Sequence, residues 1–188
     1  MNRTSVDHVY RTIRRELRFA VPYADFTRAL ETLLGRINPV LMSEIASESP
    51  ERARDRLASL VGPSGLALFQ KIDHGAMLKV LAGRSVPSMT YVVGNVLLAT
   101  EMMRHEPMVG LYFPLRIHVC ESESHSVLVS YDVPSAALAQ FTSSQIDAVA
   151  ASLDARTEKL LDVAAALASK ARSTRRRPTF RVAEGGRR

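Results

Sequence analysis

Polar side chains that could bind a ligand or move a proton stand where predicted strands of this sequence end. Asp73 and His74 follow one apolar run, Asn95 follows a second, and Tyr131 lies close to the end of a third. Histidine is the side chain whose charge changes nearest to neutral pH, and an adjacent carboxylate can fix its tautomer. Because regular strands hold their ends in fixed relative positions, we expect these four side chains to border one polar pocket.

Each of these residues also has a structural interpretation. His74 can hydrogen-bond the backbone where a short helix begins, and Asn95 can cap the next helix, which is worth about 1 kcal/mol relative to alanine. The same helix start can instead bind an anion through its unpaired N–H groups. The ring of Tyr131 is expected in a core, where its hydroxyl needs a partner such as His74 or Asn95. Ligand binding, proton transfer by His74 and structural roles therefore all stay open.

A second group of side chains has the composition of a soft-metal or haem site. Its members are Met102, His105, His118 and Cys120. Thioether, imidazole and thiolate groups suit Cu(I) or haem iron, and His118 and Cys120 share a face if they lie two apart on a strand. Methionine in a helix, however, more commonly fills gaps in a core. Cys120 as a nucleophile would need a base, and His118 is the residue on the same face.

The composition indicates one globular domain with a basic tail. The 188 residues are 46% hydrophobic, which suits a single domain with a real core. The net charge of +6 arises in residues 172–188, where seven arginines accompany one acid, so residues 1–170 are neutral overall. We expect this tail to be disordered and to act as a solubilising end; the alternative is a non-specific contact with nucleic acid or anionic lipid.

Several functional classes lack their signature in this sequence. No GxSxG, GxGxxG, Walker or HExxH motif occurs, and a single cysteine excludes both an internal disulfide and a CxxC zinc site. No apolar run is long enough to span a membrane. A nucleic-acid-binding fold is disfavoured, because the excess positive charge lies in the tail. A cytoplasmic location is expected.

Hydrophobic periodicity predicts strands and helices in alternation, followed by one long helix. Strict alternation over residues 12–21 indicates a strand, and residues 40–47 fit either a helical turn or a short strand. The other predicted helices cover 26–37, 50–61, 76–81, 96–105 and 142–171, and the other predicted strands cover 66–72, 89–93, 111–120 and 126–133.

The last two strands are expected to form a hairpin. If its turn is centred near residue 123, Val119 lies opposite Val127 and Ile117 lies opposite Val129, all on one apolar face. His118 then belongs to the other face.

Together these elements predict an α+β fold. It is a single two-layer domain over residues 12–171, with a mostly antiparallel sheet, helices on one face and a long C-terminal helix. Residues 1–11 form an N-terminal segment. The last helix, about 29 residues or roughly 43 Å long, outruns a small domain, so its second half is expected to contact something else.

Five short motifs follow one another in the middle of the chain: Ile72-Asp73-His74, Gly94-Asn95, Met102-Met103, Phe113-Pro114-Leu115 and Ser130-Tyr131. In their order and spacing, they resemble a family of uncharacterised bacterial proteins catalogued as domain of unknown function 302. The resemblance extends over about residues 14–167. Two positions depart from the family pattern: Val96 stands in place of proline, and Tyr112-Phe113 replaces Asp-Leu, which removes a carboxylate near the candidate pocket.

The resemblance implies a compact α+β fold that is often homodimeric and has no agreed activity or cofactor. From the residues themselves we expect a small polar or anionic ligand near His74, Asn95 and Tyr131. One alternative is an enzyme that uses His74 as a general acid or base. The other is an interaction protein whose long helix and arginine tail dock a partner or nucleic acid.

Overall fold

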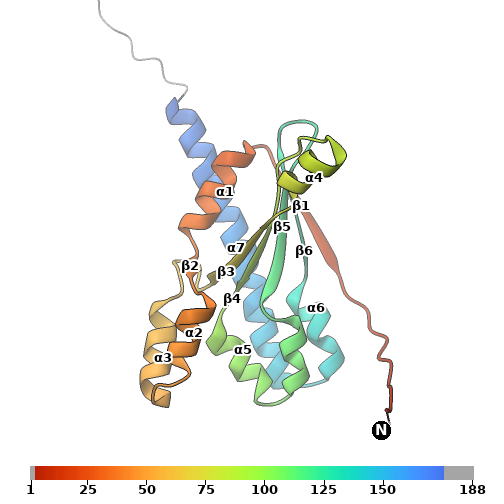
Figure 1. Ribbon diagram of the computed structural model, residues 1–188, viewed down its shortest axis with the longest axis vertical. Coiled ribbons are helices and arrows are strands. Elements are labelled where there is room, and N and C mark those ends of the chain that lie inside the picture. The colour runs from red at the N-terminus through yellow and green to blue at the C-terminus, as the bar shows by residue number, and fades with distance from the viewer. Residues whose placement is uncertain (1–2, 176–188) are drawn as a thin grey trace, which may run out of the picture.

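The computed structural model describes residues 3–175 and places one sheet against a layer of helices (Figure 1). The six strands have the order β1-β6-β5-β4-β3-β2, and all neighbours are antiparallel except β2 and β3. This is the predicted α+β architecture. Along the chain the elements are β1 (Arg14–Phe19), α1 (Tyr23–Thr32), β2 (Gly35–Arg36), α2 (Pro39–Ile45), α3 (Pro50–Ser59), β3 (Ala67–Asp73), α4 (His74–Ala82), β4 (Ser88–Gly94), α5 (Val96–Met103), the 3-10 helix η1 (Pro107–Tyr112), β5 (Leu115–Glu121), β6 (Val127–Asp132), α6 (Pro134–Leu138), the 3-10 helix η2 (Ala139–Phe141) and α7 (Ser144–Arg175).

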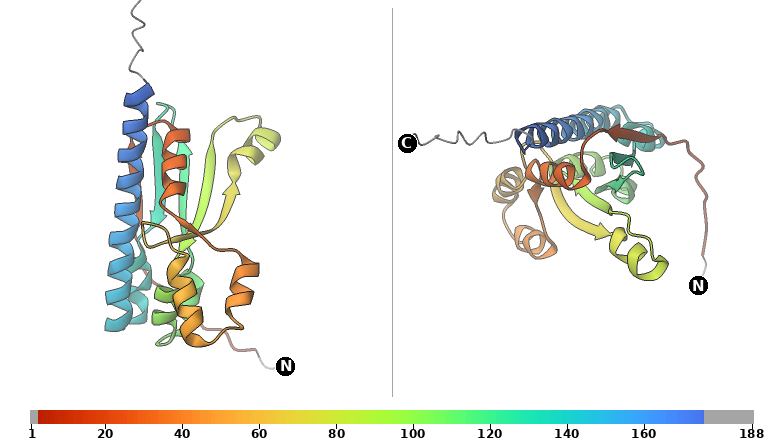
Figure 2. Two further views of the ribbon diagram at one scale, coloured as in Figure 1. Left: turned by 90° about the vertical axis from the view of Figure 1, so that its left-hand side faces the viewer. Right: turned by 90° about the horizontal axis from the view of Figure 1, so that it is seen from above.

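The sheet separates two environments, because successive side chains of a strand point to opposite faces. On β5, Ile117 and Val119 are fully buried, whereas Arg116 and His118 turn to the other side. Helices α1 and α7 cover the first face, and α4 projects on the opposite side of the sheet (Figure 2). We call this second side the open face. Its side chains include Ser88, Thr90, Val92, Arg116, His118, Cys120, Ser130 and Asp132.

Helix α7 buries one stripe of side chains along its length. Its first N–H groups are capped by Ser143, whose Oγ accepts a hydrogen bond from Ile146 N at 3.5 Å, one residue later than the expected cap at Thr142. The second half, which was expected to reach beyond the domain, packs against α1 (Figure 1). The buried residues recur at helical spacing and are Ile146, Ala150, Leu153, Thr157, Leu160, Leu161, Ala164 and Ala168.

Helix α1 ends at Thr32 rather than at the predicted residue 37. The residues that follow turn into β2, where Gly35 N donates to Leu66 O and Ile37 N donates to Leu68 O, both at 3.0 Å. The apolar spacing predicted a longer helix because Ile37 is buried too, but it is buried beside the sheet rather than on the helix. Residues 40–47 fitted either a helical turn or a short strand, and most of them belong to the helix α2, Pro39–Ile45.

The β5–β6 hairpin keeps the predicted faces but not the predicted register. Val119 lies opposite Val129 and Ile117 lies opposite Tyr131, two residues away from the expected pairs. The hairpin loop explains the difference, because Ser122 N bonds to Ser126 O and His125 adopts a left-handed φ of 54°, which centres the turn one residue later. A shift of two residues leaves each side chain on its original face.

Other boundaries also differ from the sequence-based expectation, and two of them matter for the fold. Residues 111 and 112 belong to η1, so β5 begins at Leu115. Helix α7 continues through residues 172–175, which were expected to start the tail; residues 176–188 lie outside the described part of the chain. Within residues 3–175, no helix is both long and apolar enough to cross a membrane.

Two backbone segments approach each other closely where β2 meets the loop after α3. A Cβ built on Gly35 would lie 1.7 Å from Leu60 O, and one built on Gly62 would lie 2.5 Å from Leu33 O. Both contacts are with backbone atoms, which cannot move aside as a flexible side chain can. Gly83, at the end of α4, has a φ of +63° but no atom within 4 Å of an added Cβ.

The substitution Gly35→Ala is therefore expected to lower the free energy of unfolding by at least about 3 kcal/mol, the upper range of overpacking costs. Gly83→Ala serves as the matched control, because it introduces only the left-handed backbone strain of about 1–2 kcal/mol. Urea denaturation of both variants measures the difference. Equal losses would show that the close approach at Gly35 does not exist.

Candidate functional site

Two histidines meet across a threonine hydroxyl on the open face. His74 Nε2 lies 3.0 Å from Thr90 Oγ1, and the same oxygen lies 3.0 Å from His118 Nδ1. The other ring nitrogen of His118 lies 3.2 Å from Ser88 Oγ. The two imidazole centroids are 5.6 Å apart. We call His74, Thr90, His118 and Ser88 the histidine bridge.

The sheet register and the start of α4 together position this bridge. Thr90 on β4 lies directly opposite His118 on β5, so both side chains emerge on the same face. Helix α4 begins immediately after β3, where Asp73 Oδ1 accepts a hydrogen bond from Ala76 N at 2.9 Å. A Cβ on Gly75 would lie 2.7 Å from Val86 O, so the first turn of α4 packs closely against the segment before β4. His74 is thereby held over Thr90.

The bridge couples the protonation of the two imidazoles. A hydroxyl has one proton, so Thr90 can donate to one ring nitrogen while it accepts from the other. Burial lowers the pKa of His118 below its ordinary value, and the nearby charge of His74 lowers it further. Thr90 is 9% exposed, whereas the ring of His74 is exposed to solvent. Nearly buried Thr90 therefore holds both rings in place, while His74 remains accessible to solvent.

Cys120 lies on the same face as His118 but is not activated. Burial, followed by the charge of Glu16, raises the pKa of the Cys120 thiol, and Arg18 opposes this only in part. A reactive cysteine needs the opposite shift. Cys120 therefore stays a thiol at neutral pH.

The structure separates the residues that were expected to share one pocket. Asn95 caps α5, accepting from Leu97 N at 2.9 Å, and donates to Gly65 O at 3.0 Å. Because β3 and β4 are antiparallel, Asn95 and His74 lie at opposite ends of this pair of strands. Tyr131 is buried on the helix-covered face. The predicted convergence of His74, Asn95 and Tyr131 is thus not what the fold produces.

The surroundings of Asp73 and Tyr131 also differ from those expected. The carboxylate of Asp73 caps α4 instead of bonding the His74 imidazole, whose partner is Thr90. Burial raises the pKa of Tyr131, and the nearby Arg15 cation opposes that effect. Asp73 therefore contributes by orienting α4, and Tyr131 belongs to the core.

The four candidate metal ligands are likewise dispersed. Met102 is fully buried in the hydrophobic core, where it fills space, and His105 is exposed just after α5. Only His118 and Cys120 share a face. Across residues 3–175, no group of three or more His, Cys, Asp or Glu side chains is placed to hold a metal ion.

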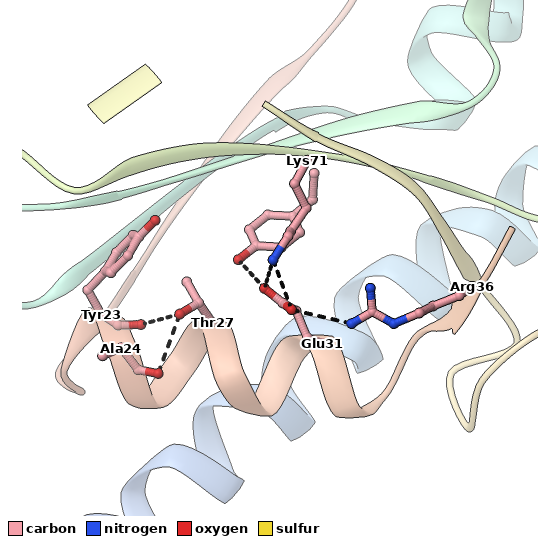
Figure 3. Close-up of polar contacts among 7 residues, drawn as sticks. Tyr23, Ala24, Thr27, Glu31, Arg36 and Lys71 are labelled. Atoms are coloured by element: carbon pink, nitrogen blue, oxygen red, sulfur yellow. Dashed lines mark hydrogen bonds and ion pairs between the residues drawn. The ribbon is translucent and has the colours of Figure 1, made fainter. Parts of the chain in front are cut away.

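A polar cluster that the sequence did not reveal lies between α1 and the sheet (Figure 3). Glu31 accepts from Lys71 Nζ at 3.0 Å and from the Tyr91 hydroxyl at 3.2 Å, and Arg36 lies 3.6 Å away. Tyr91 is 1% exposed, and burial, aided by the Glu31 charge, raises its pKa. Burial likewise raises the pKa of Tyr23 to about 12. These contacts tie α1 to β3 and β4, and we assign them a structural role.

Comparison with known proteins identifies the family. The family model described as domain of unknown function DUF302 matches residues 43–164, a range that includes the histidine bridge. The chain belongs to this family. A crystal structure of an uncharacterized conserved protein DUF302 from Bacillus stearothermophilus aligns with a TM-score of 0.56 and 14% identity over 80% of this chain and 97% of that chain. At that identity, the likeness between the two DUF302 proteins shows a shared fold alone. No curated protein matches this chain significantly.

The lowered pKa of His118 has a measurable consequence for the stability of this DUF302 protein. The unfolded chain binds a proton at about pH 6.5, whereas folded His118 resists protonation until the pH is lower. Stability is therefore expected to fall as the pH drops below about 6.5, because the unfolded state then binds more protons. Urea denaturation across this range should show a smaller fall for His118→Gln. An NMR titration that puts the His118 midpoint above about 6.5, the value of an unperturbed histidine, would contradict the assignment.

Proposed function

We propose that this DUF302 protein binds a small anionic ligand at the histidine bridge on the open face. The observation that carries the proposal is the shared Thr90 hydroxyl, 3.0 Å from a ring nitrogen of both His74 and His118. Two imidazoles at a centroid distance of 5.6 Å repel each other when both are protonated. A bound anion offsets that repulsion, and charge-assisted hydrogen bonds to it are stronger than neutral ones.

The proposal retains His74 from the sequence-based site and gives Asp73 a supporting role. Asp73 holds the first turn of α4 through Ala76 N, which fixes the origin of the His74 side chain. Asn95 and Tyr131 are not included, because one caps a distant helix and the other faces the core. The new members, Thr90 and Ser88, are 9% and 6% exposed and therefore rigidly placed beneath the ligand.

Proton transfer at the same bridge is a second candidate function. Thr90 Oγ1 can accept from one imidazole while it donates to the other, so it can pass a proton between His74 and His118. His118 has a lowered pKa and suits the role of base, and exposed His74 suits exchange with a substrate. A bell-shaped pH–activity profile that loses one limb in His74→Ala would support this function.

Assembly and location are proposed on separate grounds. A homodimer is supported by α4, which exposes Met77, Val80 and Leu81, at 54%, 73% and 82% of their surfaces. Such a patch commonly contacts another protein. A single cysteine fits the reducing cytoplasm. Sedimentation velocity tests the dimer directly, and Val80→Glu should yield monomer. Nucleic acid is proposed as a partner only through the tail.

Sulfate is a suitable probe of the histidine bridge, because its charge does not change near neutral pH. It should shift the ring resonances of His74 and His118 saturably, with higher affinity at lower pH, because binding favours the protonated imidazoles. His74→Ala is expected to weaken binding about tenfold, which corresponds to roughly 1.4 kcal/mol.

The matched control is His125→Ala, which removes an exposed histidine from the hairpin loop. It should leave the sulfate affinity unchanged. If sulfate leaves the His74 and His118 resonances in place, or if His125→Ala weakens binding as much as His74→Ala, the proposed site is wrong.

A further inference from the structure

A concave site lies further along the same strands, where β5 and β6 meet η1, α6 and the N-terminal segment. It is a cavity of about 420 Å³, within the range of small-molecule sites. Its walls are mostly apolar and aromatic, and include Tyr10, Leu111, Tyr112, Phe113, Pro114 and Leu138.

The aromatic wall of the cavity is fixed before any ligand arrives. Tyr112 meets Tyr10 edge to face at a centroid distance of 5.9 Å, and meets Phe141 in the same manner at 5.8 Å. Its hydroxyl accepts a hydrogen bond from Gln140 Nε2 at 2.8 Å. A ring held on three sides offers a rigid surface, and binding a flat apolar group there costs little ordering entropy.

Two opposite charges stand at the open-face side of this cavity. Arg116 and Asp132 both line it, each one residue beyond the paired Ile117 and Tyr131. Both residues are exposed, and within residues 3–175 neither side chain makes a hydrogen bond or an ion pair; their backbones belong to the sheet. The Asp132 charge also acts on Tyr10, whose pKa is raised chiefly by a hydrogen bond with Tyr112. The cavity thus combines an aromatic wall with one free cation and one free anion of the described chain.

We propose that this cavity binds a small aromatic molecule whose amine and carboxylate are attached to the same carbon atom. Arg116 pairs with the carboxylate, Asp132 pairs with the ammonium, and the ring lies against Tyr112. A guanidinium matches a carboxylate with two parallel hydrogen bonds, which gives the carboxylate a defined orientation. The site is independent of the histidine bridge, since neither His74 nor His118 lines the cavity.

The absence of tryptophan from the chain permits a direct test. L-Tryptophan can be excited selectively, so its fluorescence anisotropy reports binding to the full-length protein. Saturable binding is expected. Tryptamine, which lacks the carboxylate, and indole-3-propionate, which lacks the amine, should each bind about tenfold more weakly, the loss of one charged contact of roughly 1.4 kcal/mol.

Substitutions assign each charge. Arg116→Ala should weaken L-tryptophan about tenfold and leave tryptamine unchanged, whereas Asp132→Ala should weaken L-tryptophan and leave indole-3-propionate unchanged. Tyr112→Ala should weaken all three ligands. Arg18→Ala removes a cation from the same face outside the cavity, and should change none of the affinities. Thermal unfolding confirms that each variant is folded.

Three results would overturn the proposal: no saturable binding of L-tryptophan, equal binding of the three indoles, or an Arg116→Ala variant that weakens tryptamine as much as L-tryptophan. His118→Gln separates this site from the histidine bridge. It should weaken sulfate binding about tenfold and preserve L-tryptophan binding.

Discussion

Successive side chains of a strand point to opposite faces of its sheet, and β5 uses both faces for different purposes. Ile117 and Val119 are fully buried against the helix layer, while His118 between them points to the open face. A slip of one residue in strand pairing would bury the imidazole among apolar side chains and expose two core residues. The hydrophobic burial that sets the register of β5 therefore also fixes the place of His118. The same alternation on β4 buries Tyr91 and presents Thr90 to that imidazole.

The histidine bridge combines a structural requirement with an accessible surface. Thr90 and Ser88 are nearly buried hydroxyls, and leaving such groups without partners costs about 1–3 kcal/mol each. The rings of His74 and His118 provide these partners. The two imidazoles are therefore held by the hydroxyls of Thr90 and Ser88, and His74 is exposed to solvent. We propose that a ligand binds on this accessible side.

Much of the fold follows from local patterns, whereas the site does not. Alternation and helical stripes predicted the strands, the hairpin faces and the long helix α7, because each pattern reflects burial on one side. The four candidate side chains did not converge, because neighbouring antiparallel strands end at opposite ends of the sheet. Asp73 and Asn95, for example, lie at the two ends of the β3–β4 pair. Thr90 was recoverable only from the β4–β5 register, which places it opposite His118. The cluster around Glu31 joins residues that are far apart in the sequence, so no local sequence pattern could predict it.

The central claim is that the His118 ring lies on the open face beside the His74 ring, on the opposite side of the sheet from α7. Nuclear Overhauser contacts from the His118 ring protons test it directly. The account predicts contacts to the His74 ring and the Thr90 methyl group, and none to the methyl groups of Leu160 and Leu161 on α7. Contacts from His118 to those two leucines, with none to His74, would contradict it.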